Sequence, residues 1–267
     1  MVRVLSPLVS AFLMIWAGGA GLLEGVEPTA AADPWRIERT DLDQKLAASA
    51  SVSVENLYGD LRVRTGGRGE LSVHAVLQRA EADDALRIEL VAEAKGWRVR
   101  VVEPGPSKSP EGPSRRADLA ILVPADTPLS LRTGSGLVEA RGFAAALAAE
   151  TSTGEIRLRG SGAVAVRSDR GAVRLAFHPV APDGPSRLET STGDIEVELP
   201  PRASAEARME TQGSLTTDFT LVVERVGPLT KRAHARLGNG GPEIKLLSRT
   251  GDLRLLERLA VAPSAAP

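Results

Sequence analysis

The chain lacks cysteine and contains few aromatic residues. None of its 267 residues is Cys, so it has no disulfide bond, no thiolate metal ligand and no Cys nucleophile. Aromatic residues make up 3% of the chain, whereas hydrophobic residues as a whole make up 42%. A core of ordinary size must therefore be built from Val, Leu, Ile and Ala, whose side chains suit narrow, regular layers.

An excess of charge of either sign is also missing. The chain has 33 basic and 34 acidic residues and a formal net charge of −1. Nucleic-acid-binding proteins generally show a basic excess, so we expect no nucleic-acid partner. The three histidines, His74, His178 and His234, lie far apart, and none has a His or acidic partner at the spacing of a metal site. Since no phosphate-binding loop or dinucleotide fingerprint occurs either, we expect no metal and no cofactor.

The N-terminal segment is typical of an export signal. Arg3 precedes an apolar stretch at residues 5–16, and the run of alanines at 30–32 fits a small-x-small cleavage site. We therefore expect residues 1–32 to be a signal peptide, and the protein to be exported to the periplasm or the cell surface. The apolar stretch is shorter than the ~20 residues of a spanning helix. The alternative is an uncleaved anchor, in which case the protein touches the membrane only through this segment.

A short pattern, Gly-x-Φ-x-Φ with Φ apolar, recurs along the chain. It predicts a turn followed by a strand with one buried face, because alternate side chains of a strand point to opposite faces. The copy at Gly213 is the weakest, since Thr occupies its second Φ position. We expect the motif glycines to be structural turn residues. They are Gly59, Gly69, Gly136, Gly154, Gly162, Gly171, Gly193, Gly213 and Gly251.

This repeat predicts an all-β fold of stacked units. Copies that recur with a period of ~20 residues indicate repeats that share one continuous core. We expect a β-solenoid, similar to a parallel β-helix, over residues 117–257, with Gly213 and Gly251 two periods apart. A strand-rich N-terminal part at 33–103 precedes it, with a short helix starting near Asp41. The Pro-rich segment 104–116 is expected to be a loop, because Pro cannot donate ladder hydrogen bonds, and residues 258–267 to be a tail.

Hydroxyl side chains accompany the turns. A Ser or Thr often lies three positions before a motif glycine, where its oxygen can bond the backbone of its own turn. We expect these side chains to stabilise the corners of the repeat. They are Thr133, Thr151, Ser168, Thr190 and Ser248.

Several segments resemble the bacterial "putative adhesin" domain, a family of unknown function built from short repeated β-strands. The resemblance is carried by residues 52–63 (VSVENLYGDLRV), 119–124 (LAILVP), 129–136 (LSLRTGSG), 150–156 (ETSTGEI) and 189–195 (ETSTGDI). It implies a β-helix-like fold in an exported protein. It implies no catalytic residue, because the family has no established active site. The Pro-rich insert and residues 218–242 depart from the family's pattern.

Carboxylates that follow a motif glycine are the candidates for catalysis. Glu155, Asp194 and Asp252 share this position, and on adjacent turns of the repeat they would stack. Polysaccharide hydrolases on β-helices need such paired carboxylates. However, Ala172 and Ser214 interrupt the column, so these acids are better explained as turn formers. We therefore expect no catalytic residue.

These observations favour a non-enzymatic module that displays its strand faces. We expect an exported, adhesin-like or envelope scaffold protein whose partner is an unidentified envelope polymer or protein. Its candidate contact face is the outward row Asp194, Glu196 and Glu198. Two alternatives remain open at this point. One is a carbohydrate-active β-helix enzyme, and the other is a membrane-anchored envelope sensor or assembly partner.

Overall fold

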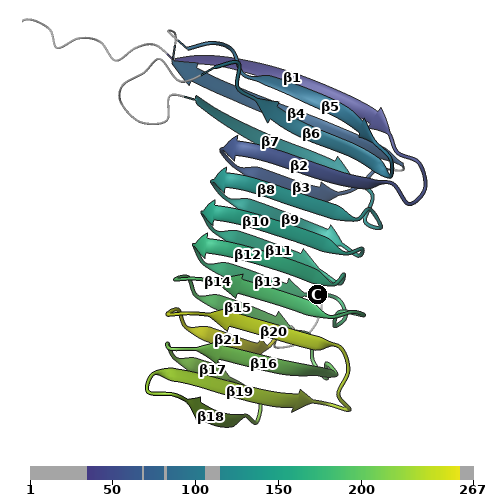
Figure 1. Ribbon diagram of the computed structural model, residues 1–267. Helices are drawn as coiled ribbons and strands as arrows, with labels where there is room; N and C mark the ends of the chain where they lie inside the picture. Colours follow the sequence, from purple (N-terminus) through teal and green to yellow (C-terminus); the bar gives the residue numbers. More distant parts are fainter. Residues whose placement is uncertain (1–34, 68, 81–82, 106–114, 259–267) are drawn as a thin grey trace, which may run out of the picture. The chain divides into compact units, whose positions relative to one another are not determined.

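The computed structural model describes residues 35–67, 69–80, 83–105 and 115–258 (Figure 1). All of them belong to one compact unit, Asp33–Pro267. Every regular element in these ranges is a β-strand, and no helix there is long and apolar enough to cross a membrane. The expected export signal at 1–32, most of the Pro-rich segment and most of the C-terminal tail lie outside the described residues.

The strands form two large sheets, of ten and eleven strands. Sheet A contains, in spatial order, β1 (Trp35–Lys45), β4 (Glu70–Ala80), β7 (Arg115–Val123), β3 (Leu61–Thr65), β9 (Val138–Phe143), β11 (Ile156–Gly160), β13 (Val173–Phe177), β15 (Ile195–Leu199), β21 (Leu253–Glu257) and β17 (Leu215–Thr217). Sheet B contains β18 (Val222–Val226), β19 (Thr230–Leu237), β16 (Ala205–Thr211), β20 (Glu243–Ser248), β14 (Ser186–Thr190), β12 (Val164–Arg170), β10 (Leu147–Thr153), β8 (Leu129–Ser135), β2 (Ser51–Tyr58), β6 (Gly96–Val102) and β5 (Arg87–Glu93).

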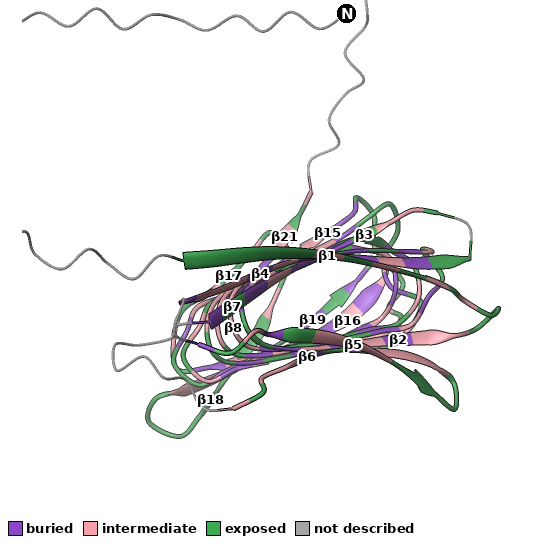
Figure 2. Ribbon diagram, turned by 90° about the horizontal axis from the view of Figure 1, so that it is seen from above, coloured by how far each residue is buried: buried purple, intermediate pink, exposed green. Residues whose placement is uncertain are grey.

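The chain passes from one sheet to the other at nearly every strand of its central part. β8 of sheet B leads into β9 of sheet A, and β10–β11, β12–β13 and β14–β15 repeat this step. We call each such pair of strands a rung. Consecutive rungs pair in parallel in both sheets, with direct register such as Ile156↔Val173. Seen from above, the two sheets form two layers with buried residues between them (Figure 2).

The core lies between the layers and follows the alternation of each strand. In β15, Ile195, Val197 and Leu199 are fully buried, whereas Glu196 and Glu198 point outward. Phe143 and Phe177 are the largest fully buried side chains. The rest of the core is mainly Leu, Val, Ile and Ala, as the composition predicted. Burying one such Leu or Ile side chain contributes about 1.5–3 kcal/mol, so every rung adds to a shared core.

The first rung is formed by β2 and β3, which come from the N-terminal part defined by the sequence. β2 pairs in parallel with β8, and β3 pairs in parallel with β9, so that Val54 lies opposite Leu131 and Val63 opposite Ala140. The segment 33–103 and the repeats at 117–257 therefore share the same two sheets and the same core.

Antiparallel strands lie at three of the four sheet edges, and at the fourth β17 pairs in parallel with β21. β1, β4 and β7 pair antiparallel in sheet A, as do β5 with β6, and β16, β19 and β18, in sheet B. The short helix expected after Asp41 is wrong, because this segment belongs to β1 and pairs with β4 from Trp35↔Ala80 to Lys45↔Glu70. Pairing satisfies the otherwise open edge of β4, and this gain outweighs a weak local helix preference.

The order of rungs in space differs from their order along the chain. β20 lies between β14 and β16, and β21 lies between β15 and β17. The last rung of the sequence is thus inserted beside β14–β15, and the rung β16–β17 is displaced outward. The expectation that Gly213 and Gly251 lie two periods apart in the stack is therefore wrong, because Gly251 lies directly between Gly193 and Gly213. The chain leaves β17, forms the hairpin β18–β19, and then returns as β20 and β21 to the position between the rungs β14–β15 and β16–β17.

Candidate functional site

The motif glycines mostly lie at one corner, where the chain passes from sheet B to sheet A. At this corner a Cβ atom added to Gly193 would lie under 3.0 Å from the carbonyl oxygen of Gly171, which real Cβ atoms essentially never do. The same close approach links the other members of the column, so Gly is required by the spacing of stacked backbones. In spatial order the column is Gly59, Gly136, Gly154, Gly171, Gly193, Gly251 and Gly213.

Two motif glycines lie elsewhere. Gly162 belongs to the opposite corner, between β11 and β12, where an added Cβ would meet the carbonyl oxygen of Ala145. Gly69 precedes β4, and its φ of 70°, with no backbone closer than the Leu46 carbonyl oxygen at 3.9 Å from an added Cβ, marks an ordinary turn. The motif therefore predicts a turn and a strand in every case, but only seven of the nine copies form the stacked corner.

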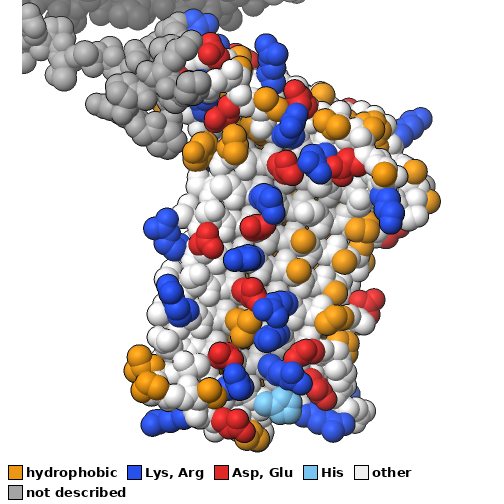
Figure 3. Space-filling model, viewed as in Figure 1, with side chains coloured by type: hydrophobic (Ala, Val, Ile, Leu, Met, Phe, Trp, Pro, Cys, Tyr) orange, Lys and Arg blue, Asp and Glu red, His pale blue; other side chains and the backbone are white. Residues whose placement is uncertain are grey.

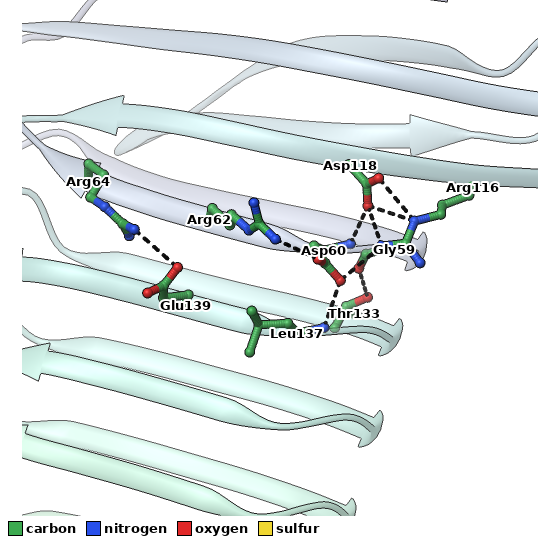
Figure 4. Close-up of polar contacts among 9 residues, drawn as sticks. All are labelled: Gly59, Asp60, Arg62, Arg64, Arg116, Asp118, Thr133, Leu137 and Glu139. Carbon is green, nitrogen blue, oxygen red and sulfur yellow. Dashed lines mark hydrogen bonds and ion pairs between the residues drawn. The ribbon is translucent and has the colours of Figure 1, made fainter. Parts of the chain in front are cut away.

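Three of the five expected hydroxyl side chains support this corner, whereas the buried hydroxyl oxygens of Thr151 and Ser168 have no hydrogen-bond partner among the described residues. The Thr190 hydroxyl accepts a hydrogen bond from the Gly193 N–H at 3.1 Å, and Ser248 does the same for Gly251 at 2.9 Å. Thr133 donates to the carbonyl oxygen of Gly59 on the neighbouring rung at 3.3 Å (Figure 4). The corner backbone, which the ladders leave partly unpaired, thus finds partners in side chains.

The aspartates after the corner glycines also bond the backbone. The Leu137 N–H donates to Asp60 Oδ1 at 3.1 Å (Figure 4). The Asp252 N–H donates to Asp194 Oδ1, and the Ser214 N–H donates to Asp252 Oδ1, both at 2.8 Å. Each carboxylate therefore links its rung to the neighbouring rung through a hydrogen bond. Asp60, Asp194 and Asp252 are therefore structural groups of the corner, whereas Glu155 pairs with Arg157 and Arg174.

The candidate contact face Asp194, Glu196 and Glu198 lies along the outer side of β15. Asp194 already accepts a hydrogen bond from the backbone N–H of Asp252. Glu196 lies between Arg174 on β13 and Arg254 on β21, and Arg254 is 3.4 Å from its carboxylate. Glu198 lies between Ala176 and Leu256, so the row follows a single strand and does not extend into a broad acidic surface.

The candidate catalytic carboxylates lie at the same corner, but the three of them are not grouped together. Because of the inserted rung, Asp194 and Asp252 lie on adjacent rungs, contrary to the order assumed from the sequence. Glu155 is separated from Asp194 by the rung that contains Ala172. Within the described residues, no group of three or more His, Cys, Asp or Glu side chains is placed to hold a metal ion.

Two glutamates on sheet A are held in the ionised state. The hydrogen bond from Arg157 lowers the pKa of Glu155 and, with the charge of Arg174, outweighs the effect of burial. For Glu139, burial raises the pKa, but hydrogen bonds and charge from Arg64 and Arg141 together bring it below its ordinary value. Neither carboxyl group keeps a proton to donate near neutral pH.

The outer face of sheet B has a regular charge pattern. Across six adjacent strands the sign of the charge alternates at every step, which Figure 3 shows as blue and red side chains down the middle of the face. Arg132 Nη2, for example, is 2.6 Å from Glu150 Oε2. Opposite charges directly across strands stabilise a sheet by about 0.2–1 kcal/mol per pair. The column is Arg100, Glu55, Arg132, Glu150, Arg167 and Glu189.

On the outer face of sheet A this alternation is interrupted by pairs of like charge. Arg141 on β9 has Arg64 on β3 directly opposite on one side and Arg159 on β11 on the other. Arg157 and Arg174 form a second opposed pair of like charges on β11 and β13. We call Arg64, Arg141, Arg157, Arg159 and Arg174 the arginine cluster. Its five guanidinium groups face two ion-paired carboxylates, Glu139 and Glu155, and Glu196 lies opposite Arg174 on the next strand.

A shallow groove runs through the arginine cluster. Its volume is about 270 Å³, and its charged lining consists of four arginines and three glutamates, with the small side chain of Ala176 beside them. They are Arg141, Arg157, Arg159, Arg174, Glu139, Glu196 and Glu198. No sequence pattern used above marks these arginines as a functional group. Their common signal is the offset from the corner glycine, since Arg64, Arg141 and Arg159 each lie five positions after one.

Comparisons with known proteins return similar solved structures of bacterial proteins. No family model matches the chain, and no curated protein matches it. A "putative cell adhesion protein" from Clostridium sporogenes is 14% identical, with a TM-score of 0.45, over 83% of this chain and 100% of that one. A "putative adhesin" from Bacteroides fragilis is 13% identical, with a TM-score of 0.42, over 83% and 97%.

The resemblance to bacterial adhesins noted in the sequence is thus also found among solved structures. At these identities and TM-scores, no ligand or activity follows from it.

Proposed function

We propose that the protein is a non-enzymatic display module, exported to the cell envelope, whose rungs form a β-solenoid. Parallel pairing from rung to rung and seven stacked corner glycines support the solenoid. In this role the protein is adhesin-like or a scaffold, and it presents long rows of side chains to an envelope polymer or protein. Such repeated rows suit many weak contacts that add up to stable attachment.

The observation that supports this proposal most is the arrangement of the polar side chains. At the corner they bond backbone groups of neighbouring rungs, and on the two sheet faces they form straight columns at the spacing of the strands. A display surface needs such columns, whereas an active site needs side chains that converge on one point.

The alternative of a polysaccharide-cleaving enzyme has less support. A glycosidase needs a carboxyl group with a raised pKa as its proton donor. The pKa of Glu155 is lowered by Arg157 and Arg174, and Asp194 already accepts a backbone hydrogen bond. The side chains nearest to a paired-carboxylate arrangement are thus occupied as structural or ion-paired groups.

The test is retention of envelope material by the full-length protein. Immobilised protein is incubated with separate glycan and protein fractions of the envelope, and bound glycans and proteins are quantified. We expect a defined polymer or protein to be retained. Glu196→Gln/Glu198→Gln tests the candidate contact row, because these side chains make no corner hydrogen bond among the described residues, and Glu150→Gln on sheet B is the matched control. Failure of both fractions to be retained would remove the display function.

Export is tested on the same protein. Mass spectrometry of the protein recovered outside the cytoplasm should find Asp33 at its N-terminus if residues 1–32 are a cleaved signal. An intact N-terminus would favour the anchored alternative, and recovery from the cytoplasm alone would contradict export.

A further inference from the structure

We propose that the arginine cluster on sheet A binds an acidic polysaccharide, with the polymer running across the strands. This inference rests on the proposed display function and deepens it. It names the face, the residues and the chemical class of the partner. The ligand is a linear glycan that carries one carboxylate or sulfate group per sugar ring.

The comparison of the two sheet faces is the first argument. On sheet B, every charge of the six-strand column has the opposite charge across the strand. On sheet A, Arg64, Arg141 and Arg159 follow one another on adjacent strands. Like charges directly opposite each other destabilise a sheet. The same molecule thus balances every step of the column on sheet B and leaves like charges directly opposed on sheet A, as expected of a surface that gains part of its counter-charge from a ligand.

The state of the individual arginines is the second argument. Arg64 and Arg141 share the carboxylate of Glu139, and Arg157 and Arg174 share that of Glu155. Arg159 has no hydrogen bond or ion pair with any described residue. Each guanidinium group has five N–H donors, so most donors of the cluster remain available. The side chains of Arg141, Arg157 and Arg174 are 50–56% exposed, so these donors face solvent.

The nature of the cations favours anionic groups with planar or tetrahedral oxygens. All five are Arg, whose rigid fork binds carboxylate, sulfate or phosphate with two parallel hydrogen bonds. No aromatic side chain lies among the residues that line the groove, so stacking on sugar rings does not contribute. We therefore expect binding to depend on charge and to weaken with added salt.

The spacing of the arginines favours a glycan over an acidic peptide. Neighbouring strands lie ~4.8 Å apart, which sets the interval between Arg64, Arg141 and Arg159. An extended peptide places side chains on one face only every ~6.7 Å, because alternate residues point away. Its acidic groups would lose register within three strands. Rotation about the glycosidic bonds lets a glycan with one acidic group per ring turn successive acidic groups toward the same face, so it is not bound to this two-residue alternation.

The experiment measures binding of defined polymers to the full-length protein by titration calorimetry at low salt. Polygalacturonate supplies one carboxylate per ring, dextran sulfate supplies sulfate groups, dextran is the neutral control, and poly-L-glutamate is the acidic peptide. The test variant is Arg141→Gln/Arg159→Gln. The matched control is Arg132→Gln/Arg167→Gln, which removes two exposed arginines from the alternating column of sheet B.

We expect an acidic glycan to bind and dextran not to bind. The test variant should lose at least tenfold in affinity, and the control variant should change less than twofold. Preference between polygalacturonate and dextran sulfate identifies the anionic group. Arg159→Gln alone is the second variant, because this side chain has no partner in the described structure whose loss would disturb folding.

Three results would overturn the proposal. They are no binding of either acidic glycan at low salt, equal loss in the test and control variants, and tighter binding of poly-L-glutamate than of both glycans. If the arginine variants still retain envelope material as the wild type does, the site is wrong and the display function stands. If neither polymers nor envelope fractions bind, both are wrong.

Discussion

A single methyl group at the stacked corner should be among the most destabilising changes in this protein. We consider Gly193→Ala. An Ala Cβ there would lie under 3.0 Å from the carbonyl oxygen and carbon of Gly171, so the two rungs would have to separate. The φ angle of Gly193 lies outside the left-handed range, so an Ala is not strained by its own backbone conformation. The change therefore isolates the steric effect of close stacking.

The expected cost has two parts. Forcing extra atoms into a packed region costs about 1–3 kcal/mol. Separation of the rungs also weakens the ladder bonds beside the corner, Val173 N–H to Asp194 O at 2.8 Å and Ile195 N–H to Asp252 O at 2.9 Å. Each is worth about 1 kcal/mol. We expect a loss of about 3–5 kcal/mol in the free energy of unfolding, a large part of the 5–15 kcal/mol typical of a whole domain.

Gly67→Ala provides the control. Gly67 has a φ of 70°, and an added Cβ would meet no atom within 4 Å. Its substitution carries only the conformational cost of a left-handed residue, about 1–2 kcal/mol. Both variants are compared with the wild type by urea unfolding at 25 °C, followed by far-ultraviolet circular dichroism. If Gly193→Ala is no more destabilising than Gly67→Ala, close stacking is not the reason for glycine at the corner.

Three further predictions concern polar groups. Asp252→Ala should lower the free energy of unfolding by about 0.5–1.5 kcal/mol, because the Ser214 N–H loses its acceptor, and Asp252→Asn, which keeps an acceptor, should lower it less in the same urea assay. The folded-state pKa of Glu139 is lowered, so the stability that its ion pairs contribute is present above the ordinary carboxyl pKa and is lost as the pH falls through the folded value. The Glu139→Gln variant should therefore lose less stability than the wild type on acidification. An equal loss in both proteins would contradict the ion pairs. Arg115→Ala should lower the free energy of unfolding by about 3–5 kcal/mol, because it removes the guanidinium whose Nε lies 3.6 Å from the buried carboxylate of Asp83. A loss below 1 kcal/mol in thermal and urea unfolding would show that stability does not depend on this pair.

Much of the fold could be predicted because its signals are local. The alternation of Ile195, Val197 and Leu199 with outward glutamates predicts a strand with one buried face, and burial confirms it. The glycine before it predicts the corner. The hydroxyls of Thr190 and Ser248 predict side-chain support for that corner, which the hydrogen bonds confirm. In each case the residues that decide the structure are neighbours in the chain.

The expectations that failed depend on partners distant in sequence. The segment after Asp41 has weak helix signals of its own, but β4 offers an open edge, and pairing with it produces β1. The contact row Asp194, Glu196 and Glu198 is visible from the alternation of β15, yet the sequence does not show that Arg174 and Arg254 lie beside it. Alternation assigns a side chain to a face but does not name its neighbour on the next strand.

The sequence by itself determined the building unit: a strand, a glycine corner and a second strand, with one apolar face each and a core of aliphatic side chains. Only the tertiary structure decided how the units are ordered. The rung that ends with Gly251 fits between those of Gly193 and Gly213 because similar rungs offer similar edges, and the long excursion through β18 and β19 lets the chain return to an inner position. The same long-range pairing brings Arg64 beside Arg141 and so creates the arginine cluster.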